Sequence, residues 1–387
     1  MKTQIAILDF DDIKNPLLGA GQARATFEVG KRLAKKGFTM TVYCSRYPGS
    51  QNYTHHGISY VHVGLGSKNI KLNNLVYILS IPFVVPKIKA DLIMECFTAP
   101  ISTLFSPLFT RIPVVALSTM FDADVFSQKY HLPLSWIEKL GCRFYRYFIA
   151  LSKPYADKMR NLNQQVTTTV IPEGVDSSFF KIKRSAKPKH ILFLARFDMQ
   201  QKGIDLLLEA YSKVADQIKL PLVLAGYGTD EGQIRNLAQK LGISDKVIFP
   251  GAIYGKQKEK LMSEAAFAVL PSRHETFSCF ALEALAAGLP IVRFDVDGLS
   301  WMETTAMLKS PAFNVDDFAR LLLRASRPEF FKIQSAVARS FAAQFSWDTV
   351  AQQFAAFFQK ILQDTHHLQK PSYSRHFRRQ FSRGGLS

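Results

Sequence analysis

Two carboxylates, Glu275 and Glu283, lie eight positions apart across a predicted junction between a loop and a helix. The apolar segments 266–270 and 291–294 on either side are predicted strands. A carboxylate in the loop and a second one within the helix can face one ligand from two heights. Because carboxylates accept hydrogen bonds, this spacing suits a hydroxyl-rich ligand. The alternative is a solvated loop residue and an exposed helix position.

Two cations follow another predicted strand, 190–195. Arg196 stands at the end of this strand and Lys202 at the entrance of the following helix. A guanidinium and an ammonium in these positions can clamp a diphosphate, with the helix amides adding partial positive charge. Two exposed surface cations are the simpler alternative.

Paired glycines open two helical segments. Gly226 and Gly228 follow a predicted strand, and Gly19 and Gly21 lie between the first strand and an amphipathic helix. Glycine permits close approach of the backbone to a phosphate or a sugar. A structural turn between strand and helix explains either pair equally simply.

The stretch 271–290 resembles the Glu-x7-Glu signature of the retaining GT-B glycosyltransferases of family 4, also called glycosyl transferases group 1. Arg196 and Lys202 match the Arg and Lys of the family segment Gly-Arg-x5-Lys-Gly, with Ala195 replacing its first Gly. The resemblance extends over residues 3–362. It implies an α/β chain with the GT-B fold, in which two Rossmann-like doubly wound domains face each other across a cleft. A C-terminal helix would cross back to the first domain.

The resemblance also implies roles for individual residues. Glu275 would lie beside the donor sugar, Glu283 would hold the ribose, and Arg196 with Lys202 would stabilise the departing nucleoside diphosphate. The other expected donor-binding residues are Gly19, Gly21, Gly226, Gly228, Ile253, Thr276, Phe277 and Ser278. Ile253 would contact the base.

The chain departs from the family pattern at three places. Thr276, Phe277 and Ser278 replace the usual Gly-Phe-Gly, and the usual adjacent glycines are split as Gly19 and Gly21. No His follows the predicted strand 114–117, where the family often has one. Asp122 is expected to take the polar catalytic role there, with Ser118 and Thr119 as alternatives.

Alternating strands and helices predict parallel sheets in two domains, which also fits a length of 387 residues. The predicted strands are 4–10, 39–44, 58–63, 92–96, 114–117, 148–151, 168–171, 190–195, 222–225, 247–249, 266–270 and 291–294. The expected units are an acceptor-side domain over 1–175, a nucleotide-sugar domain over 176–345, a bracing helix over 346–365 and a disordered basic tail over 366–387. The best linker candidate is 181–189.

Charge is unevenly distributed in this chain, whose net charge is +18. Residues 1–175 carry 20 Lys and Arg against 11 Asp and Glu, and residues 366–387 carry 5 against none. This favours an anionic membrane surface or glycan as partner. Nucleic acid is not expected, because no recognition motif accompanies the charge. The four cysteines show no metal or disulfide spacing.

No signal peptide or membrane-spanning segment is predicted. The longest apolar run, 72–85, is broken by Pro82 and is too short to span a bilayer. A buried crossover helix is the favoured interpretation of this run, and a membrane-docking segment is the alternative. The expected location is the cytoplasm, including the inner face of the plasma membrane.

The sequence therefore predicts a retaining, metal-independent hexosyltransferase that uses a nucleoside-diphosphate sugar and needs no cofactor. The expected acceptor is a hydroxyl of a glycan or a lipid-linked molecule in cell-envelope polysaccharide or glycolipid synthesis. The GT-B fold also hosts epimerases and phosphorylases. A catalytically silent carbohydrate-binding subunit of a membrane complex is a further alternative.

Overall fold

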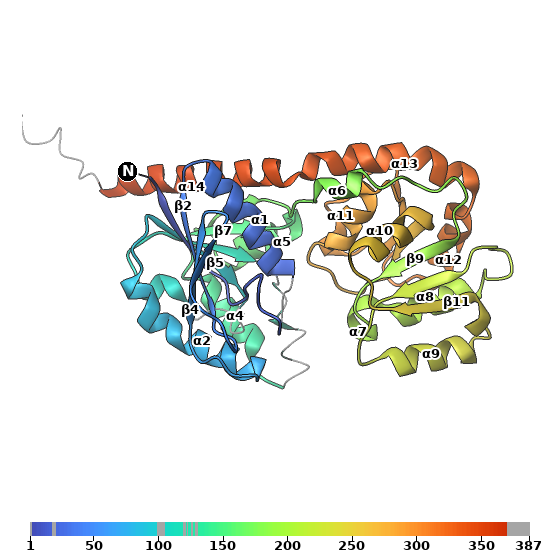
Figure 1. Cartoon of the computed structure of the whole chain (residues 1–387), viewed down its shortest axis with the longest axis horizontal. Helices are drawn as coiled ribbons and strands as arrows, with labels where there is room; N and C mark the ends of the chain where they lie inside the picture. The colour runs from blue at the N-terminus through green and yellow to red at the C-terminus, as the bar shows by residue number, and fades with distance from the viewer. Residues whose placement is uncertain are drawn as a thin grey trace, which may run out of the picture.

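The computed structural model describes residues 2–17, 21–98, 105–118, 121, 123–124, 127 and 131–369. Two parallel sheets, each with helices on both faces, form two domains that lie side by side (Figure 1). This layering agrees with the predicted alternation of strands and helices and with the expected pair of Rossmann-like domains.

The first domain contains an eight-stranded sheet with the order β3-β4-β2-β1-β5-β6-β7-β8. All neighbours are parallel except β3 and β4, which form an antiparallel hairpin. Its strands are β1 (Gln4–Leu8), β2 (Thr39–Ser45), β3 (Tyr53–His55), β4 (Ile58–Val63), β5 (Leu92–Phe97), β6 (Val114–Ser118), β7 (Tyr147–Ala150) and β8 (Thr167–Val170). Its helices are α1 (Gly21–Lys35), α2 (Ile70–Val84), α4 (Leu134–Cys142) and α5 (Lys153–Leu162), with short turns η1 (Val85–Lys87) and η2 (Ser106–Leu108).

The second domain contains a six-stranded parallel sheet with the order β11-β10-β9-β12-β13-β14. Its strands are β9 (His190–Leu194), β10 (Leu222–Ala225), β11 (Val247–Gly251), β12 (Ala265–Leu270), β13 (Ile291–Phe294) and β14 (Met307–Ser310). Its helices are α6 (Ser177–Phe180), α7 (Met199–Lys202), α8 (Ile204–Ser212), α9 (Glu231–Lys240), α10 (Gly255–Glu264), α11 (Cys279–Ala286), α12 (Val315–Ala325) and α13 (Pro328–Ala342). The last helix, α14 (Trp347–Gln369), returns to the first domain (Figure 1). Short turns are η3 (Ser244–Lys246), η4 (Asp297–Leu299) and η5 (Ala343–Phe345).

Every predicted strand is present, with ends shifted by at most two residues. Two strands were not predicted. β3 has only three residues, and β14 is a four-residue strand at the edge of its sheet. A three-residue segment such as β3 carries too few alternating positions to be recognised by period.

The chain crosses between the domains twice, at neighbouring points. The backbone amide of Val175 donates to the carbonyl of Phe345 at 2.8 Å, beside the bridge between Val175 and Ser346. From there α14 runs back along the first domain (Figure 1), where Phe357 contacts Tyr147 edge to face. The helix continues to Gln369, beyond the predicted boundary at 365. Residues 366–369 are therefore helical rather than part of the predicted disordered tail. The predicted tail beyond 369 lies outside the described residues.

The apolar run predicted as a buried crossover helix is α2, and it is only half buried. Tyr77, Ile78 and Ile81 enter the core, whereas Leu79 and Phe83 are exposed. The predicted crossover helix is therefore present, but it is buried on one face only. No helix among the described residues has both the length and the apolar character needed to cross a membrane.

The loop after β1 is held by buried carboxylates. Asp9 accepts a 2.5 Å hydrogen bond from the Thr26 hydroxyl on α1. Asp12 accepts a 2.5 Å hydrogen bond from the Tyr53 hydroxyl and contacts His62 Nε2 at 2.9 Å. These contacts fix the approach of the chain to the start of α1.

Burial of Asp9 predicts a pH-dependent stability. Burial raises its pKa from 3.8 to about 6, against the opposing effect of the Thr26 hydrogen bond. The folded state thus favours the protonated carboxyl, and this contribution is present below pH 3.8 and lost as the pH rises through 6. We expect Asp9→Asn to raise the free energy of unfolding at pH 7.5 by up to about 3 kcal/mol.

Thermal unfolding of wild type and Asp9→Asn at pH 4.5 and 7.5 measures this effect. The gain should shrink markedly at the lower pH. Asp245→Asn, at an exposed position, serves as the control. An equal change at both pH values would contradict a buried charge at Asp9.

Candidate active site between the two domains

Two loops of the second domain are bound tightly together. The Arg273 guanidinium contacts both carboxylate oxygens of Asp205, at 2.8 and 2.6 Å, and the Arg273 amide donates to the Gln201 carbonyl at 3.0 Å. Gly203 lies between the loops with a φ of +60°, and a Cβ there would come within 2.0 Å of the Pro271 carbonyl oxygen. Glycine at this position lets the start of α8 approach the loop after β12.

This arrangement brings together Glu275 and Lys202, two of the predicted site residues. Lys202 Nζ lies 2.7 Å from Glu275 Oε1, which also accepts a 2.7 Å hydrogen bond from the Ser272 hydroxyl. Both side chains are largely buried. A paired cation and anion at low exposure form a preorganised charged site, since little water remains to screen them.

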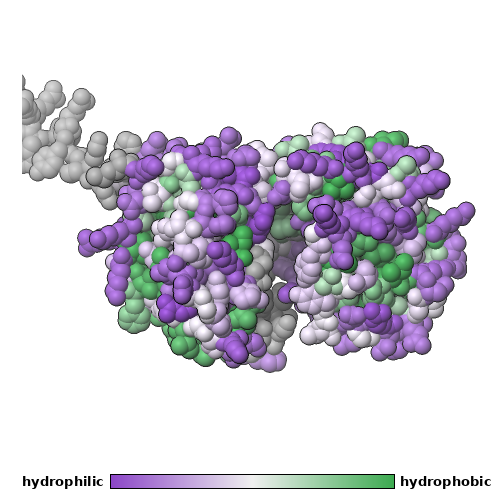
Figure 2. All heavy atoms as spheres, in the orientation of Figure 1, coloured by the Kyte–Doolittle hydropathy of each residue, from purple (hydrophilic) through white to green (hydrophobic). Residues whose placement is uncertain are grey.

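A cavity of about 330 Å³ adjoins Glu275 and is bounded by both domains. Its lining residues are Pro154, Tyr155, Lys158, Arg273, His274, Glu275, Val296, Asp297 and Gly298. The Tyr155 hydroxyl, on α5 of the first domain, donates to the Glu275 carbonyl at 3.3 Å. Figure 2 shows a hollow between the two domains on the face in view. The charged and polar lining suits a polar ligand.

Glu283 lies on α11 and is paired with Lys258 of α10, whose Nζ is 2.5 Å from Glu283 Oε2. Burial raises the pKa of Glu283, and the Lys258 ammonium opposes this shift. Glu173, at the first crossing between the domains, contacts the Cys279 thiol at 2.9 Å, and its pKa is also raised by burial. The second predicted carboxylate, Glu283, therefore lies on α11 as a partly desolvated acidic group.

Arg196 takes no part in the Lys202–Glu275 pair. Its guanidinium is exposed and donates to Gln201 Oε1 at 3.1 Å. Gly226 and Gly228 lie close by, since a Cβ on either would come within 1.9 or 2.2 Å of the Ala195 or Phe197 carbonyl oxygen. The glycine turn therefore packs directly on the segment that carries Arg196.

The segment that follows Glu275 differs in its details from the expectation. The Phe277 ring is buried and stacks on Trp301 at 4.2 Å, so its side chain belongs to the core. Thr276 is partly exposed. Ser278 has a φ of +67° and caps α11. A non-glycine residue in this left-handed region costs about 1 kcal/mol or more, which explains why the family favours glycine there.

The remaining predicted residues contribute less to the geometry. Gly21 is the first residue of α1, and a Cβ there would meet no atom within 4 Å. Ile253 is partly buried after β11. Gly19 and Asp122 lie outside the described residues.

Sequence reasoning missed several residues that line or support the site. Tyr155, Lys158 and Asp297 come from segments without a recognised motif, and Lys258 lies on a helix of mostly polar residues. Their only signal was position, because α5 and η4 follow the carboxyl ends of β7 and β13. Ligands of open parallel sheets bind at that edge.

One group of metal-type ligands occurs among the described residues. Ligand atoms of Asp12, Cys44 and His62 lie within 4.8 Å of one another. The Asp12 oxygens already accept hydrogen bonds from two tyrosine hydroxyls, and burial raises the pKa of the Cys44 thiol. The contacts therefore describe a hydrogen-bonded anchor for the loop after β1.

Gly298 supplies a sharp structural prediction. A Cβ at Gly298 would come within 1.6 Å of the Glu275 carbonyl oxygen, so Gly298→Ala must displace the segment that carries Glu275. We expect a loss of about 1–3 kcal/mol in the free energy of unfolding. Chemical unfolding measures the change. Gly232→Ala is the matched control, because a Cβ there meets nothing within 4 Å. Equal stability of the two variants would contradict the close contact.

Comparison with known proteins gives consistent matches in both halves of the chain. Residues 19–179 match the family model Glycosyltransferase Family 4, and residues 175–329 match Glycosyl transferases group 1. An MMP alpha-(1->4)-mannosyltransferase of Mycolicibacterium hassiacum is 30% identical over 199 residues, which are 50% of this chain and 48% of the relative. The matched segments span about half or less of the lengths of the first curated relatives.

Solved structures resemble almost the whole chain. Sucrose-phosphate synthase of Thermosynechococcus elongatus has a TM-score of 0.75 at 19% identity, covering 94% of this chain and 100% of that one. HepE of Anabaena, solved with UDP and glucose, has a TM-score of 0.69 at 15% identity, covering 93% and 100%. At such identities these likenesses concern the fold. Taken with the two family models, they show that the chain belongs to the glycosyltransferases of the GT-B type.

Proposed function

We propose that the protein transfers a sugar from a nucleoside-diphosphate sugar to a hydroxyl group, with retention of configuration at the anomeric carbon. The observation that carries the proposal is the largely buried Lys202–Glu275 pair beside a polar cavity bounded by both domains. A charged pair at a water-poor junction can hold a sugar and stabilise a departing anion. HepE, which has this fold, was solved with UDP and glucose.

The donor is proposed to lie across the second domain. Glu283 would accept hydrogen bonds from the ribose hydroxyls, sharing its carboxylate with Lys258. Arg196 is exposed and free to turn from Gln201 toward a diphosphate. Lys202 would neutralise the charge that develops on the leaving group, so these cations supply the electrostatic stabilisation that the reaction needs.

A front-face substitution fits these contacts better than double displacement. Among the described residues that line the cavity, the carboxylates are Glu275 and Asp297. Glu275 is held by Lys202 and Ser272, which suits a role in orienting the sugar. The leaving phosphate would then assist the incoming hydroxyl on the same face, and retention follows.

Two substitutions separate binding from transfer. Glu283→Ala should weaken nucleotide binding about tenfold or more, because hydrogen bonds to a charged group are lost. Lys202→Ala should lower turnover by a factor of about 10²–10³ while affecting affinity less. Calorimetry with the nucleotide and steady-state kinetics measure both effects. Lys240→Ala, at an exposed position of α9, is the control. Wild-type turnover in either site variant would remove its assigned role.

An apolar and basic surface of the first domain supports a lipid-linked acceptor. Leu79 and Phe83 of α2 are exposed, and Trp136 of α4 is 64% exposed. The exposed lysines near the ends of α2 are Lys68, Lys71, Lys87 and Lys89. Figure 2 shows apolar residues at the lower edge of this domain, where Figure 1 places α2. Aromatic and apolar side chains flanked by lysines suit the interface of an anionic membrane.

The docking surface is tested by sedimentation with phosphatidylglycerol vesicles. Leu79→Gln combined with Phe83→Gln should reduce binding at least tenfold, since each buried methylene contributes about 0.8 kcal/mol and these side chains carry several. Ile333→Gln, an exposed apolar residue of the second domain, is the matched control. Undiminished binding by the double variant would exclude α2 as the membrane contact.

The transfer reaction is tested by release of nucleoside diphosphate from a panel of UDP-, GDP- and ADP-sugars. Each donor is supplied with and without liposomes that carry a prenyl-phosphate glycan. Release with one donor, stimulated by these liposomes, would support a role in envelope polysaccharide or glycolipid synthesis. Conversion of a donor to its epimer without an acceptor, or failure to bind any nucleotide, would overturn the proposal.

A further inference from the structure

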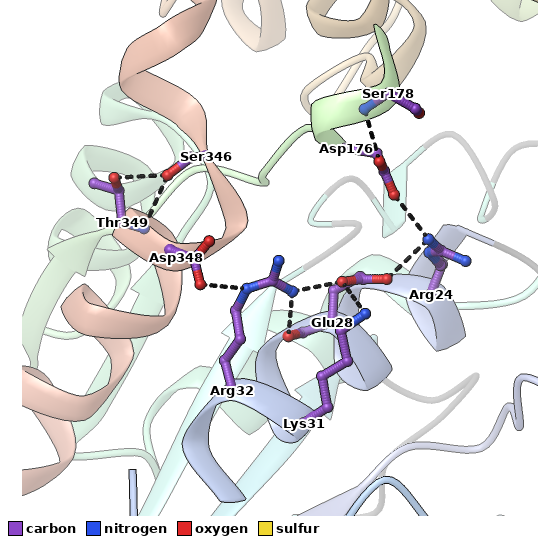
Figure 3. A network of polar contacts seen from close by, with 9 residues as sticks. All are labelled: Arg24, Glu28, Lys31, Arg32, Asp176, Ser178, Ser346, Asp348 and Thr349. Atoms are coloured by element: carbon purple, nitrogen blue, oxygen red, sulfur yellow. Dashed lines mark hydrogen bonds and ion pairs between the residues drawn. The ribbon is translucent and has the colours of Figure 1, made fainter. Parts of the chain in front are cut away.

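One buried carboxylate on α1 gathers three cations. Glu28 is 1% exposed in its side chain, and its oxygens lie 2.8 Å from Arg24, 2.6 Å from Lys31 and 2.5 Å from Arg32 (Figure 3). All four residues belong to the same helix. A buried charge is tolerated only where it is paired, so Glu28 fixes the directions of the surrounding cations.

Two of these cations extend to the two places where the chain crosses between the domains. Arg24 donates to Asp176 Oδ2 at 3.2 Å, just after the first crossing. Arg32 donates to Asp348 Oδ1 at 2.9 Å, just after the second crossing. Figure 3 shows this continuous chain of contacts, with Glu28 between the two arginines. We call the five residues Arg24, Glu28, Arg32, Asp176 and Asp348 the crossing network.

The crossing segments are themselves ordered at these points. Asp176 accepts from the Ser178 amide at 2.9 Å and so caps α6. Ser346 accepts from the Thr349 amide at 3.1 Å at the start of α14. Each tether therefore attaches to a helix start rather than to a loose loop, and force on it is transmitted to a rigid element.

The crossing network also lies near the candidate donor site. Arg24 lowers and Asp176 raises the pKa of the Glu283 carboxyl, although burial and Lys258 act on it more strongly. α1 itself begins at Gly21, at the carboxyl edge of the first sheet. Through Arg24–Asp176 the network joins α1 to the segment that enters the domain carrying Glu283, and through Arg32–Asp348 it fixes on α1 the start of the helix that returns from that domain.

We propose that Glu28 is a positioning residue which, through Arg24–Asp176 and Arg32–Asp348, sets the angle between the two domains for donor use. The effect on catalysis rests on the proposed function, since the candidate site is bounded by both domains. The effect on the domain angle does not depend on the proposed function. If only a fraction of molecules holds the competent angle, apparent donor affinity falls by that fraction.

The main test removes both tethers and keeps the buried hub. Asp176→Asn combined with Asp348→Asn abolishes the two charges, while asparagine can still cap α6. We expect faster hydrogen exchange in peptides 175–180 and 347–353 and a changed small-angle scattering profile. The donor KM should rise about fivefold or more, a typical size for coupling between sites. Binding of UDP, GDP or ADP alone should change less than about twofold, because those contacts belong to the second domain.

A second variant addresses the hub itself. Glu28→Gln should reproduce the exchange and scattering changes. Glu231→Gln is the matched control, because Arg235 and Glu231 form an i,i+4 pair at 2.8 Å, as do Arg24 and Glu28, and the two arginines are 50% and 52% exposed. This control should leave the domain arrangement and the KM unchanged. Raised salt should weaken the network in wild type and have less effect in the tether variant.

The outcomes separate the two proposals. Wild-type exchange and scattering in the tether variant would overturn the positioning role, whatever the activity. Altered scattering with an unchanged donor KM would also overturn it, because the angle would then not govern donor use. Altered scattering in a protein that turns over no donor at all would support control of the domain angle and count against the proposed transfer reaction.

Discussion

The ion pair between Arg273 and Asp205 is the contact on which the rest of the candidate site depends. It holds the loop after β12 against the start of α8, with both guanidinium contacts below 3 Å. In that position Lys202 reaches Glu275, and the Glu275 carbonyl accepts from Tyr155 of the other domain. A two-pronged arginine contact is both strong and directional, so it sets the orientation of a loop as well as its distance.

The sequence predicted the fold, and it singled out two residues that the structure places in contact, for physical reasons. Strand and helix periods are local properties, and the strands were found because buried parallel strands are continuous apolar runs. Glu275 and Lys202 were predicted independently, from a carboxylate spacing and from a strand-to-helix cation. Their direct pairing was not predicted, because it depends on how two loops pack at Gly203, and the paired residues are 73 positions apart in the chain. Lys258 and Tyr155 were not predicted either, because their positions at the site also depend on packing between segments far apart in the sequence.

The burial of α2 also differs from the prediction of a buried crossover helix, because only one face of the helix is buried. Composition reports how apolar a helix is but not how much of it the neighbouring strands can cover. In this fold the core accepts Tyr77, Ile78 and Ile81, and the opposite side keeps Leu79 and Phe83 in solvent. An exposed apolar helix face is costly unless something covers it, and this cost is the physical ground for the membrane contact proposed above.

The path of α14 has a consequence for the order in which the molecule is completed. Phe354, Phe358 and Ile361 are buried, and this part of α14 packs along α1 and the first sheet. The first domain is therefore discontinuous in sequence, with its last structural element made after the entire second domain. During synthesis the apolar surface of the first domain that α14 covers stays exposed until those residues are made, when the second domain already has all its strands. The two domains thus differ in folding history, and the first becomes closed only after α14 has been made.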